Sequence, residues 1–290
     1  MSPAETPNPH PRPPGGFTLI ELLAVIAIVL VLTLLLAPAF TSLKSAGDVT
    51  NAAYTIKGVL EQARTYAMAN NTYTWVGFYE EDASQPPTTP ATSGNGRIVL
   101  SIAASKDGTT VYNRNSNTDP DPIDPTRLTQ VGKLIRIENV HLPIFADGSG
   151  TGATFDARPP ADASFDNACS CYDTRNSRFG DLNAVPPNSA PSADSQFPFQ
   201  YPVGNPTPTA QYLFRKILQF NPRGESSFTV KYTGPPSYKT YNTLRVVEIG
   251  LLSTHGITVP TPTPSAGQYV GNVAAIQITG LGGNIKVYRR

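Results

Sequence analysis

The chain has little of what catalytic and charged binding proteins commonly use. Charged residues make up 15% of its 290 residues, and 22 Lys+Arg against 21 Asp+Glu leave a formal net charge of +1. That balance gives no global reason to expect a nucleic acid or a membrane surface as partner. The three histidines, His10, His141 and His255, lie in unrelated contexts, and neither an H-E-x-x-H motif nor a phosphate-binding glycine loop occurs. We therefore expect no enzyme, no cofactor and no metal site.

Cysteine is scarce as well, because Cys169 and Cys171 are the only two. Two cysteines make no disulfide framework, and the C-x-C spacing is awkward for a mutual bridge. A cysteine pair without a nearby histidine or a second pair is a weak metal signal. A strained or intermolecular disulfide and two ordinary loop cysteines both stay possible.

The N-terminus, by contrast, has a strong pattern. Residues 1–16 are rich in proline and glycine, and the apolar run FTLIELLAVIAIVLVLTLLLAPAF follows over residues 17–40. A helix of these 24 residues would be about 36 Å long at about 1.5 Å per residue. Because a bilayer's hydrocarbon core is roughly 30 Å thick, the run predicts a transmembrane helix over residues 17–40.

One acidic residue, Glu21, interrupts the apolar run near its start. An ionised side chain deep in a bilayer costs on the order of 2.5–3.5 kcal/mol and normally has a partner. The alternative is that Glu21 lies in the headgroup zone, where the cost is small. Glu21 alone does not decide between the two.

The residues around Glu21 carry a resemblance to a known family. The string Gly15-Gly16-Phe17-Thr18-Leu19-Ile20-Glu21-Leu22-Leu23 resembles the class III signal of type IV pilins and type II secretion pseudopilins. The resemblance implies that a membrane peptidase removes a leader, residues 1–16, by cutting after Gly16. It also implies N-methylation of Phe17, the new first residue. Pro38 matches the position where many pilins have a helix-kinking proline.

Physical chemistry agrees with this resemblance. Gly16 lacks a side chain, so a protease can approach its backbone closely, and the cut creates an α-amino group on Phe17. In an assembly of parallel helices this cation can meet the Glu21 carboxylate of a neighbouring subunit, and burying either charge alone would be costly. Pro38 lacks an N–H group and is expected to disrupt the local helix ladder.

A secretory signal peptide is the main alternative for the N-terminus. Ala37-Pro38-Ala39 looks like an A-x-A cleavage site, and cutting there would leave Phe40 as the first residue. The apolar run is longer than the usual 7–15 residues of such signals, and it contains Glu21. The first residue of the mature chain, Phe17 or Phe40, distinguishes the two readings.

The helix pattern continues beyond Pro38. Apolar residues recur at spacings of four and three and predict one face of an amphipathic helix: Val49, Ala53, Ile56, Leu60, Ala63 and Ala67. Glu61 and Arg64 are placed to pair at i, i+3, and Asn70-Asn71 reads as the helix end. We expect one helix over residues 17–71 whose second half packs on a globular domain, residues 72–290.

About eight strand-like runs follow in the domain: Thr72–Tyr79, Arg97–Ala103, Leu134–Val140, Arg215–Phe220, Ser227–Tyr232, Leu244–Leu251, Val273–Thr279 and Ile285–Tyr288. Turn signals occur at residues 221–224 and 281–284. The fold class is therefore α+β, with an antiparallel β-sheet or β-sandwich packed on the long helix. A Pro-, Ser- and Asp-rich stretch, residues 146–210, is expected to be a long surface insertion.

The C-terminal pattern carries a second resemblance. Three segments together are similar to the end of H-type minor pseudopilins, the GspH/FimT group: Ile217–Gly224, Val273–Thr279 and the closing GNIKVYRR. This resemblance implies a minor subunit of a secretion pseudopilus or pilus. Its implied partners are other pilin-like subunits, the prepilin peptidase and methyltransferase, and an assembly platform in the bacterial inner membrane, with the C-terminal domain in the periplasm.

Two weaker ligand signals lie in the domain. Asp119, Asp121 and Asp124 could bind Ca²⁺ through oxygen ligands, although the intervening prolines favour a solvated loop. Lys286, Arg289 and Arg290 form a small basic tail that could contact phosphates, but three charges are few, so we do not expect nucleic acid as a partner. The alternative to a structural subunit is a pilus-tip binding protein, an adhesin or DNA-uptake receptor, that uses the tail or residues 146–210.

Overall fold

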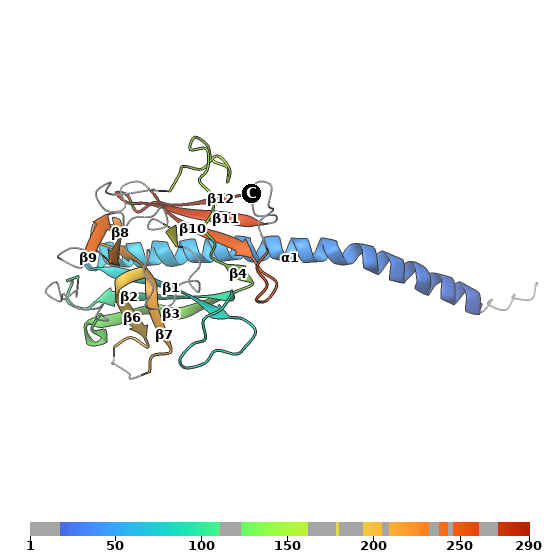
Figure 1. Ribbon diagram of the computed structural model, residues 1–290, viewed down its shortest axis with the longest axis horizontal. Coiled ribbons are helices and arrows are strands. Elements are labelled where there is room, and N and C mark those ends of the chain that lie inside the picture. The colour runs from blue at the N-terminus through green and yellow to red at the C-terminus, as the bar shows by residue number, and fades with distance from the viewer. Residues whose placement is uncertain are drawn as a thin grey trace, which may run out of the picture. The chain divides into compact units, whose positions relative to one another are not determined.

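The computed structural model describes residues 18–110, 123–161, 178–179, 194–204, 209–231, 238–242, 246–260 and 272–290. The chain divides into two units, Met1–Leu43 and Lys44–Arg290. The second unit contains both β-sheets and the second half of the long helix (Figure 1).

The long helix, α1, runs from Leu19 to Ala69 without a break. Pro38 lies inside it, so the expected disruption of the helix at this proline does not appear in the single chain. The helix ends where the sequence indicated: Asn71 adopts a left-handed φ of 49°, and the Thr72 amide donates to the carbonyl of Ala67 at 3.0 Å. Asparagine is among the few non-glycine residues that favour this conformation.

Two β-sheets follow the helix. The first has seven strands in the order β3-β2-β1-β7-β8-β9, with β6 also paired to β7. Its strands are β1 (Thr74–Asp82), β2 (Gly96–Ser105), β3 (Leu128–Glu138), β6 (Asp194–Tyr201), β7 (Tyr212–Phe220), β8 (Ser226–Lys231) and β9 (Tyr238–Asn242).

The second sheet has five strands in the order β12-β11-β10-β4, with β5 also paired to β10. Its strands are β4 (Val140–His141), β5 (Arg178–Phe179), β10 (Val246–Ser253), β11 (Val273–Thr279) and β12 (Ile285–Arg289). The pairing of β5 with β10 is parallel and the other described pairings are antiparallel. A short 3₁₀ helix, η1 (Pro125–Arg127), precedes β3. The expected α+β class with antiparallel sheets is confirmed.

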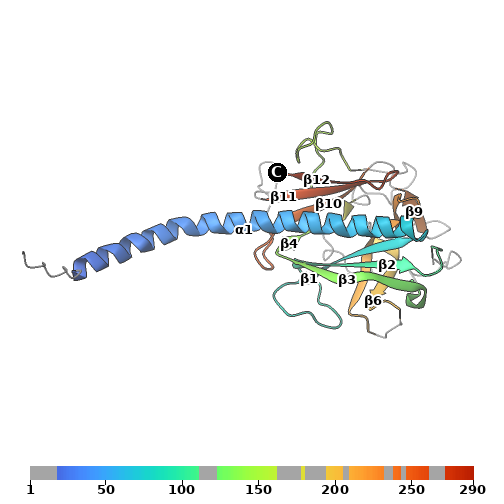
Figure 2. The same cartoon turned by 180° about the vertical axis from the view of Figure 1, so that it is seen from behind.

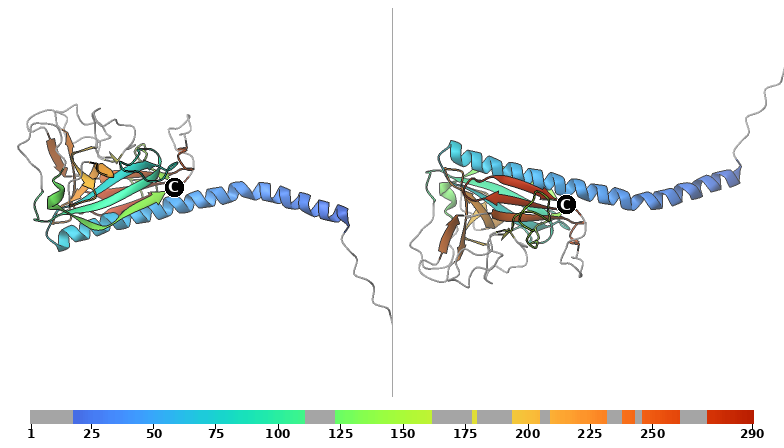
Figure 3. Two further views of the ribbon diagram at one scale, coloured as in Figure 1. Left: turned by 90° about the horizontal axis from the view of Figure 1, so that it is seen from below. Right: turned by 90° about the horizontal axis from the view of Figure 1, so that it is seen from above.

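The second half of α1 packs against strands of both sheets and runs along one side of them (Figures 2 and 3). All six residues of the predicted apolar stripe are buried, and they share one core with strands from both sheets. Ile56 and Leu60, both fully buried, are the largest of these helical side chains. Burial of one such side chain contributes about 1.5–3 kcal/mol, so the stripe holds the helix against both sheets.

Each of the eight predicted strands corresponds to an observed strand, with one change. The run Leu134–Val140 is divided into β3 and β4 at Asn139, whose φ of 61° ends the first strand. Beyond this point the chain crosses from the first sheet to the second. Short strands β5 and β9 and strand β6 were not predicted, because their residues lie among prolines and polar residues. Segment 146–210 contributes β5 and β6, one to each sheet.

Arg64 on α1 does not pair with Glu61 as its spacing suggested. Its Nε donates to the carbonyl of Gly224 at 3.2 Å, in the turn between β7 and β8. Glu61 instead pairs with Lys57 at 3.6 Å. The turn between β11 and β12 packs on the same arginine, because a Cβ on Gly283 would fall against Arg64 and the Gly224 carbonyl. Arg64 therefore joins the helix to two turns, and this long-range contact replaces the local pair.

Residues 143–161 cover the outer face of the second sheet. Arg158, only 2% exposed, pairs with Glu248 of β10 at 2.7 Å, and its guanidinium lies 4.3 Å from the ring centroid of Phe155. Gln277 of β11 donates to both Glu248 and the carbonyl of Pro159. This part of the expected surface insertion is thus held to the sheet by a buried ion pair.

Candidate functional site at the start of the helix

A reciprocal cap closes the N-terminal end of α1. The Thr18 amide and hydroxyl both donate to Oε2 of Glu21 at 3.0 Å. In return the Glu21 amide donates to the Thr18 hydroxyl at 3.3 Å. This is the capping box, which satisfies amides that a helix start would otherwise leave without partners. Glu21 therefore has a local role in the single chain.

The cap leaves part of the Glu21 carboxylate available. Both bonds from Thr18 use Oε2, and Oε1 accepts no bond from any residue that the structure describes. An ionised carboxylate can accept about four hydrogen bonds. Glu21 can thus cap its own helix and still receive a cation from another molecule.

The first turns of α1 beyond the cap present apolar side chains to solvent. Leu19 is 80% exposed and Ile20 is 76% exposed. Nine further apolar side chains in the next turns are between 50% and 62% exposed: Leu22, Leu23, Val25, Ile26, Ile28, Val29, Leu30, Val31 and Leu32. A contiguous exposed apolar surface marks an interaction site with protein or lipid. We call residues 19–32 the apolar segment.

The structure tests the other N-terminal predictions only in part. Gly16 and Phe17 lie outside the described residues, so cleavage and methylation stay predictions. Glu21 is placed by its cap, and Pro38 by its position within α1. Among the residues that the structure describes, no helix is both long and apolar enough to count as a candidate membrane span.

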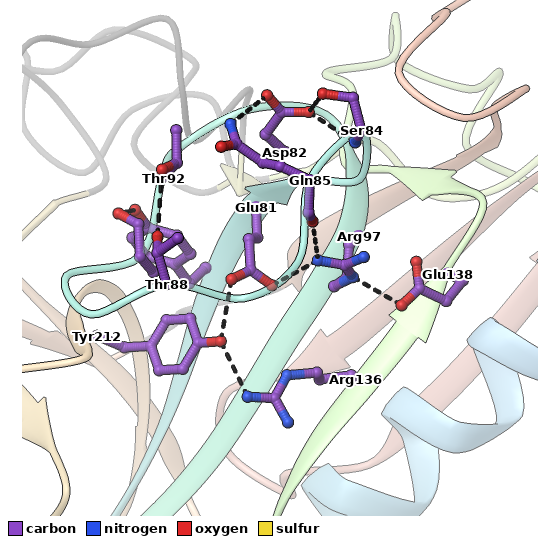
Figure 4. Close-up of polar contacts among 12 residues, drawn as sticks. Glu81, Asp82, Ser84, Gln85, Thr88, Thr92, Arg97, Arg136, Glu138 and Tyr212 are labelled. Atoms are coloured by element: carbon purple, nitrogen blue, oxygen red, sulfur yellow. Dashed lines mark hydrogen bonds and ion pairs between the residues drawn. The ribbon is translucent and has the colours of Figure 1, made fainter.

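A network of charged and polar side chains lies at one end of the first sheet (Figure 4). Arg97 of β2 donates to Glu81 at 3.1 Å and to Glu138 at 2.6 Å. The Tyr212 hydroxyl donates to Glu81 at 3.2 Å and accepts from Arg136 at 3.1 Å. Arg97 also donates to the carbonyl of Gln85. The network ties four strands to the β1–β2 loop.

Tyrosines in and beside this network titrate at higher pH than free tyrosine. Burial raises the pKa of Tyr212, and the nearby Glu81 carboxylate adds to the rise while Arg136 opposes it. Burial also raises the pKa of Tyr79, whose ring packs edge-on against Tyr212 with centroids 5.3 Å apart. Both tyrosines are thus neutral at physiological pH. The groups in this network hydrogen-bond to one another, which fits a structural role.

A second buried pair joins the two sheets. His141 Nδ1 on β4 lies 2.6 Å from Glu80 Oε1 on β1. Their side chains are 6% and 0% exposed. The pair therefore stabilises the chain segment that crosses from β3 in the first sheet to β4 in the second. His141 is thus a core residue. His255 lies in an exposed turn and bridges to Thr258 through the backbone.

The structure places some of the residues that the sequence suggested as weak ligand sites. Asp124 caps η1, since its carboxylate accepts from the Thr126 amide at 2.9 Å. Arg290 of the basic tail pairs with Asp156 at 3.1 Å, and Lys286 lies over the Tyr288 ring. These contacts leave less free charge in the tail for phosphate binding. Asp119, Asp121, Cys169, Cys171 and His10 lie outside the described residues.

Thr18 is the residue of this site that sequence reasoning missed. The signal was present, because Thr18-Leu19-Ile20-Glu21 has the T-x-x-E spacing of a capping box just before an apolar run. The buried pairs Glu80–His141 and Arg158–Glu248 had no comparable signal, since their partners are 61 and 90 residues apart.

Comparison with known protein families finds one match, and it lies at the N-terminus, where the cap and the apolar segment are. The family model of the prokaryotic N-terminal methylation motif matches residues 12–37. This match covers Gly16, Phe17, Glu21 and most of the apolar run. No curated protein and no solved structure matches the chain.

Proposed function

We propose that this protein is a pilin-like structural subunit that assembles with other subunits through the apolar segment of α1. The observation that carries the proposal is the combination of a matched methylation motif with an exposed apolar helix whose first turn is capped by Thr18 and Glu21. Exposed apolar surface of this extent is stabilised by contact with lipid or with other helices.

Glu21 gives the assembly its register. Cutting after Gly16 places an α-amino group one residue before the Thr18 cap. In a neighbouring subunit Glu21 Oε1 can accept this ammonium while Oε2 keeps its bonds to Thr18. Among apolar helices an uncompensated charge is costly, so subunits that are out of register by a turn are disfavoured. The apolar segment supplies the remaining contact area.

Maturation and assembly can be tested separately. Gly16→Ala should block cleavage, which a larger band on a gel of the membrane fraction would reveal. Glu21→Ala should leave cleavage intact and reduce recovery of the protein in sheared filaments or in chemically cross-linked oligomers. Cleaved Glu21→Ala protein that assembles at the wild-type level would refute the pairing of charges.

The finer assignment is a minor pseudopilin of the H type, in a secretion pseudopilus or pilus-like filament. Supporting this assignment are the Pro-x-Gly turn after β7 and the closing hairpin of β11 and β12, both present in the fold. Its partners would be other pilin-like subunits, a prepilin peptidase that also methylates, and an inner-membrane platform. We propose a periplasmic location for the β-rich domain, with the apolar segment as the membrane anchor before assembly.

A deletion that tests the role of segment 146–210 has to leave the buried residues of this segment in place. Arg158 and Phe199 are both fully buried, so removing the whole segment would damage both sheets. A deletion confined to residues 162–177 spares residues 143–161 and β6. Normal filaments with lost adhesion or DNA uptake would favour a binding protein over a structural subunit.

A further inference from the structure

The last strand, β12, forms one edge of the second sheet. It pairs with β11 along its whole length, Ile285–Arg289, without a shift in register. At the two ends of this ladder Thr279 donates to the carbonyl of Asn284 at 3.0 Å, and Arg290 donates to the carbonyl of Val273 at 3.3 Å. Because hydrogen-bonded positions alternate along an antiparallel ladder, the even-numbered residues of this strand bond to β11.

The backbone groups of the odd-numbered residues point away from β11. These are the N–H and C=O groups of Ile285, Val287 and Arg289, and no residue that the structure describes forms a hydrogen bond with them. A row of unpaired backbone groups at a sheet edge is a template for a further strand. The edge is also well fixed, because the side chain of Tyr288 is buried. A fixed edge loses little conformational entropy when a partner binds.

An edge strand of the first sheet, β3, is built differently. Its register with β2 shifts between Leu100 and Ile102, and Gly132 opposite this shift has a φ of 74°. Such a bulge interrupts the row of pairing groups and protects an edge against further strands. Lys133, which follows in the bulge, is exposed and adds a charge. Strand β12 has no such interruption, so it is better suited than β3 to accept a strand.

Charge restricts which strand β12 can accept. Lys286 and Arg289 are exposed, and neither forms an ion pair within the part of the chain that the structure describes. Lys286 lies with Tyr288 on the outer face of the sheet, whereas Arg289 shares the opposite face with Val287. A second copy of β12 would bring like charges together at this edge, which disfavours pairing. An acidic strand would place carboxylates beside the two cations.

We infer that β12 is a docking edge for an extended acidic segment of a partner protein, which joins the second sheet as an additional strand. The main chain of the segment bonds to the free backbone groups of β12. Antiparallel alignment places a carboxylate opposite Arg289, an apolar side chain opposite Val287 and a second carboxylate opposite Lys286. This edge is separate from the apolar segment of α1, so the inference does not depend on the proposed function.

Binding of a designed peptide to the full-length protein in detergent tests the main-chain pairing. The probe is fluorescein-labelled Ser-Glu-Thr-Val-Glu-Val-Ser, whose central residues match the alignment on β12, and fluorescence anisotropy measures its affinity. N-methylation of the first valine removes an amide hydrogen that points at β12, and it should weaken binding about tenfold. N-methylation of the next glutamate blocks an amide that points away and should leave binding nearly unchanged. Equal losses from the two modifications, or no binding of the unmodified probe at millimolar concentration, would overturn the inference.

Charge reversal in the protein tests the chemistry of the partner. Lys286→Glu and Arg289→Glu should each lower the affinity for the acidic probe about threefold to tenfold. Each should raise the affinity for a probe in which lysine replaces both glutamates, a gain that a misfolded variant would not show. Lys133→Glu makes the same charge change on the bulged edge of β3 and is the matched control. A loss in Lys133→Glu as large as that in Lys286→Glu would show that net charge alone attracts the probe, and it would overturn docking at β12.

Discussion

Glu21 accepts two hydrogen bonds from Thr18, each 3.0 Å long, at the first turn of α1. The same carboxylate is the group that we propose to receive the terminal amine of a neighbouring subunit. Local helix capping and assembly thus depend on one side chain. Substitutions at the two residues separate these roles.

Thr18→Val should weaken the cap but retain the Glu21 charge. Loss of an N-terminal cap costs about 0.5–2 kcal/mol, so the first turn of α1 should fray while assembly is only partly reduced. Glu21→Gln keeps the shape of the side chain and removes its charge, and we expect a larger loss of assembly. The ratio of cleaved to assembled protein in each variant measures this difference. Equal losses in the two variants would show that the charge of Glu21 has no separate role.

The contact of Arg64 with two turns should be weakened when one methyl group is added at Gly283. Gly283 has a φ of 57°, and a Cβ there would fall against the Gly224 carbonyl and Arg64. Gly283→Ala should therefore lower the free energy of unfolding by about 1–3 kcal/mol, through backbone strain and displaced packing. Urea denaturation of the purified protein measures the change. Gly47→Ala is the control, since it adds the same methyl group where no atom lies within 4 Å.

The buried Arg158–Glu248 pair holds residues 143–161 on the second sheet. Removing one partner leaves an uncompensated buried charge and costs about 3–5 kcal/mol. Glu248→Gln should therefore destabilise the domain and speed proteolysis between residues 143 and 161. Arg158→Met combined with Glu248→Gln should recover part of that loss. If the double variant is no more stable than Glu248→Gln, the unpaired charge is not the cause.

Acid stability should depend in part on Asp107. Arg127, whose Nη2 lies 2.6 Å from Oδ2, is the largest cause that lowers the pKa of Asp107 below the ordinary 3.8, with further bonds from Thr109 and Ser105. A lowered pKa means that the ionised form stabilises the folded state. This contribution is present above about pH 4 and is lost as the pH falls through the folded pKa. The stability difference between wild type and Asp107→Asn should thus shrink below pH 4. A difference that stays constant from pH 7 to pH 2 would contradict this assignment.

Local patterns predicted the helix and the main strands. The buried stripe of α1, with Ile56 and Leu60, and the alternating or apolar runs of β1, β2 and β11 each depend on a short stretch of sequence. The contacts that the sequence did not predict join residues far apart in the chain. Arg64 bonds to Gly224 across 160 positions, and no local rule favours that bond over the nearby Glu61. Strand β6 was missed because proline and polar residues surround Phe199, which is buried only by tertiary packing against Phe214.

The candidate site was predictable to the extent that it is local. Glu21 is recognisable in the sequence as the one acidic residue in an apolar run, and its role in the cap follows from the four-residue motif Thr18–Glu21. Which strands cover the buried face of α1 could not be predicted from local spacing, because strands of both sheets meet that face only in the folded domain (Figure 3).

Mass spectrometry of the N-terminal peptide, from protein purified out of the cells that produce it, checks the proposed cleavage and methylation. We predict that the native chain begins at Phe17 and is heavier than the unmodified peptide by the mass of one methyl group replacing a hydrogen. A native chain that still contains residues before Gly16, or that begins at Phe40, would contradict the proposed function.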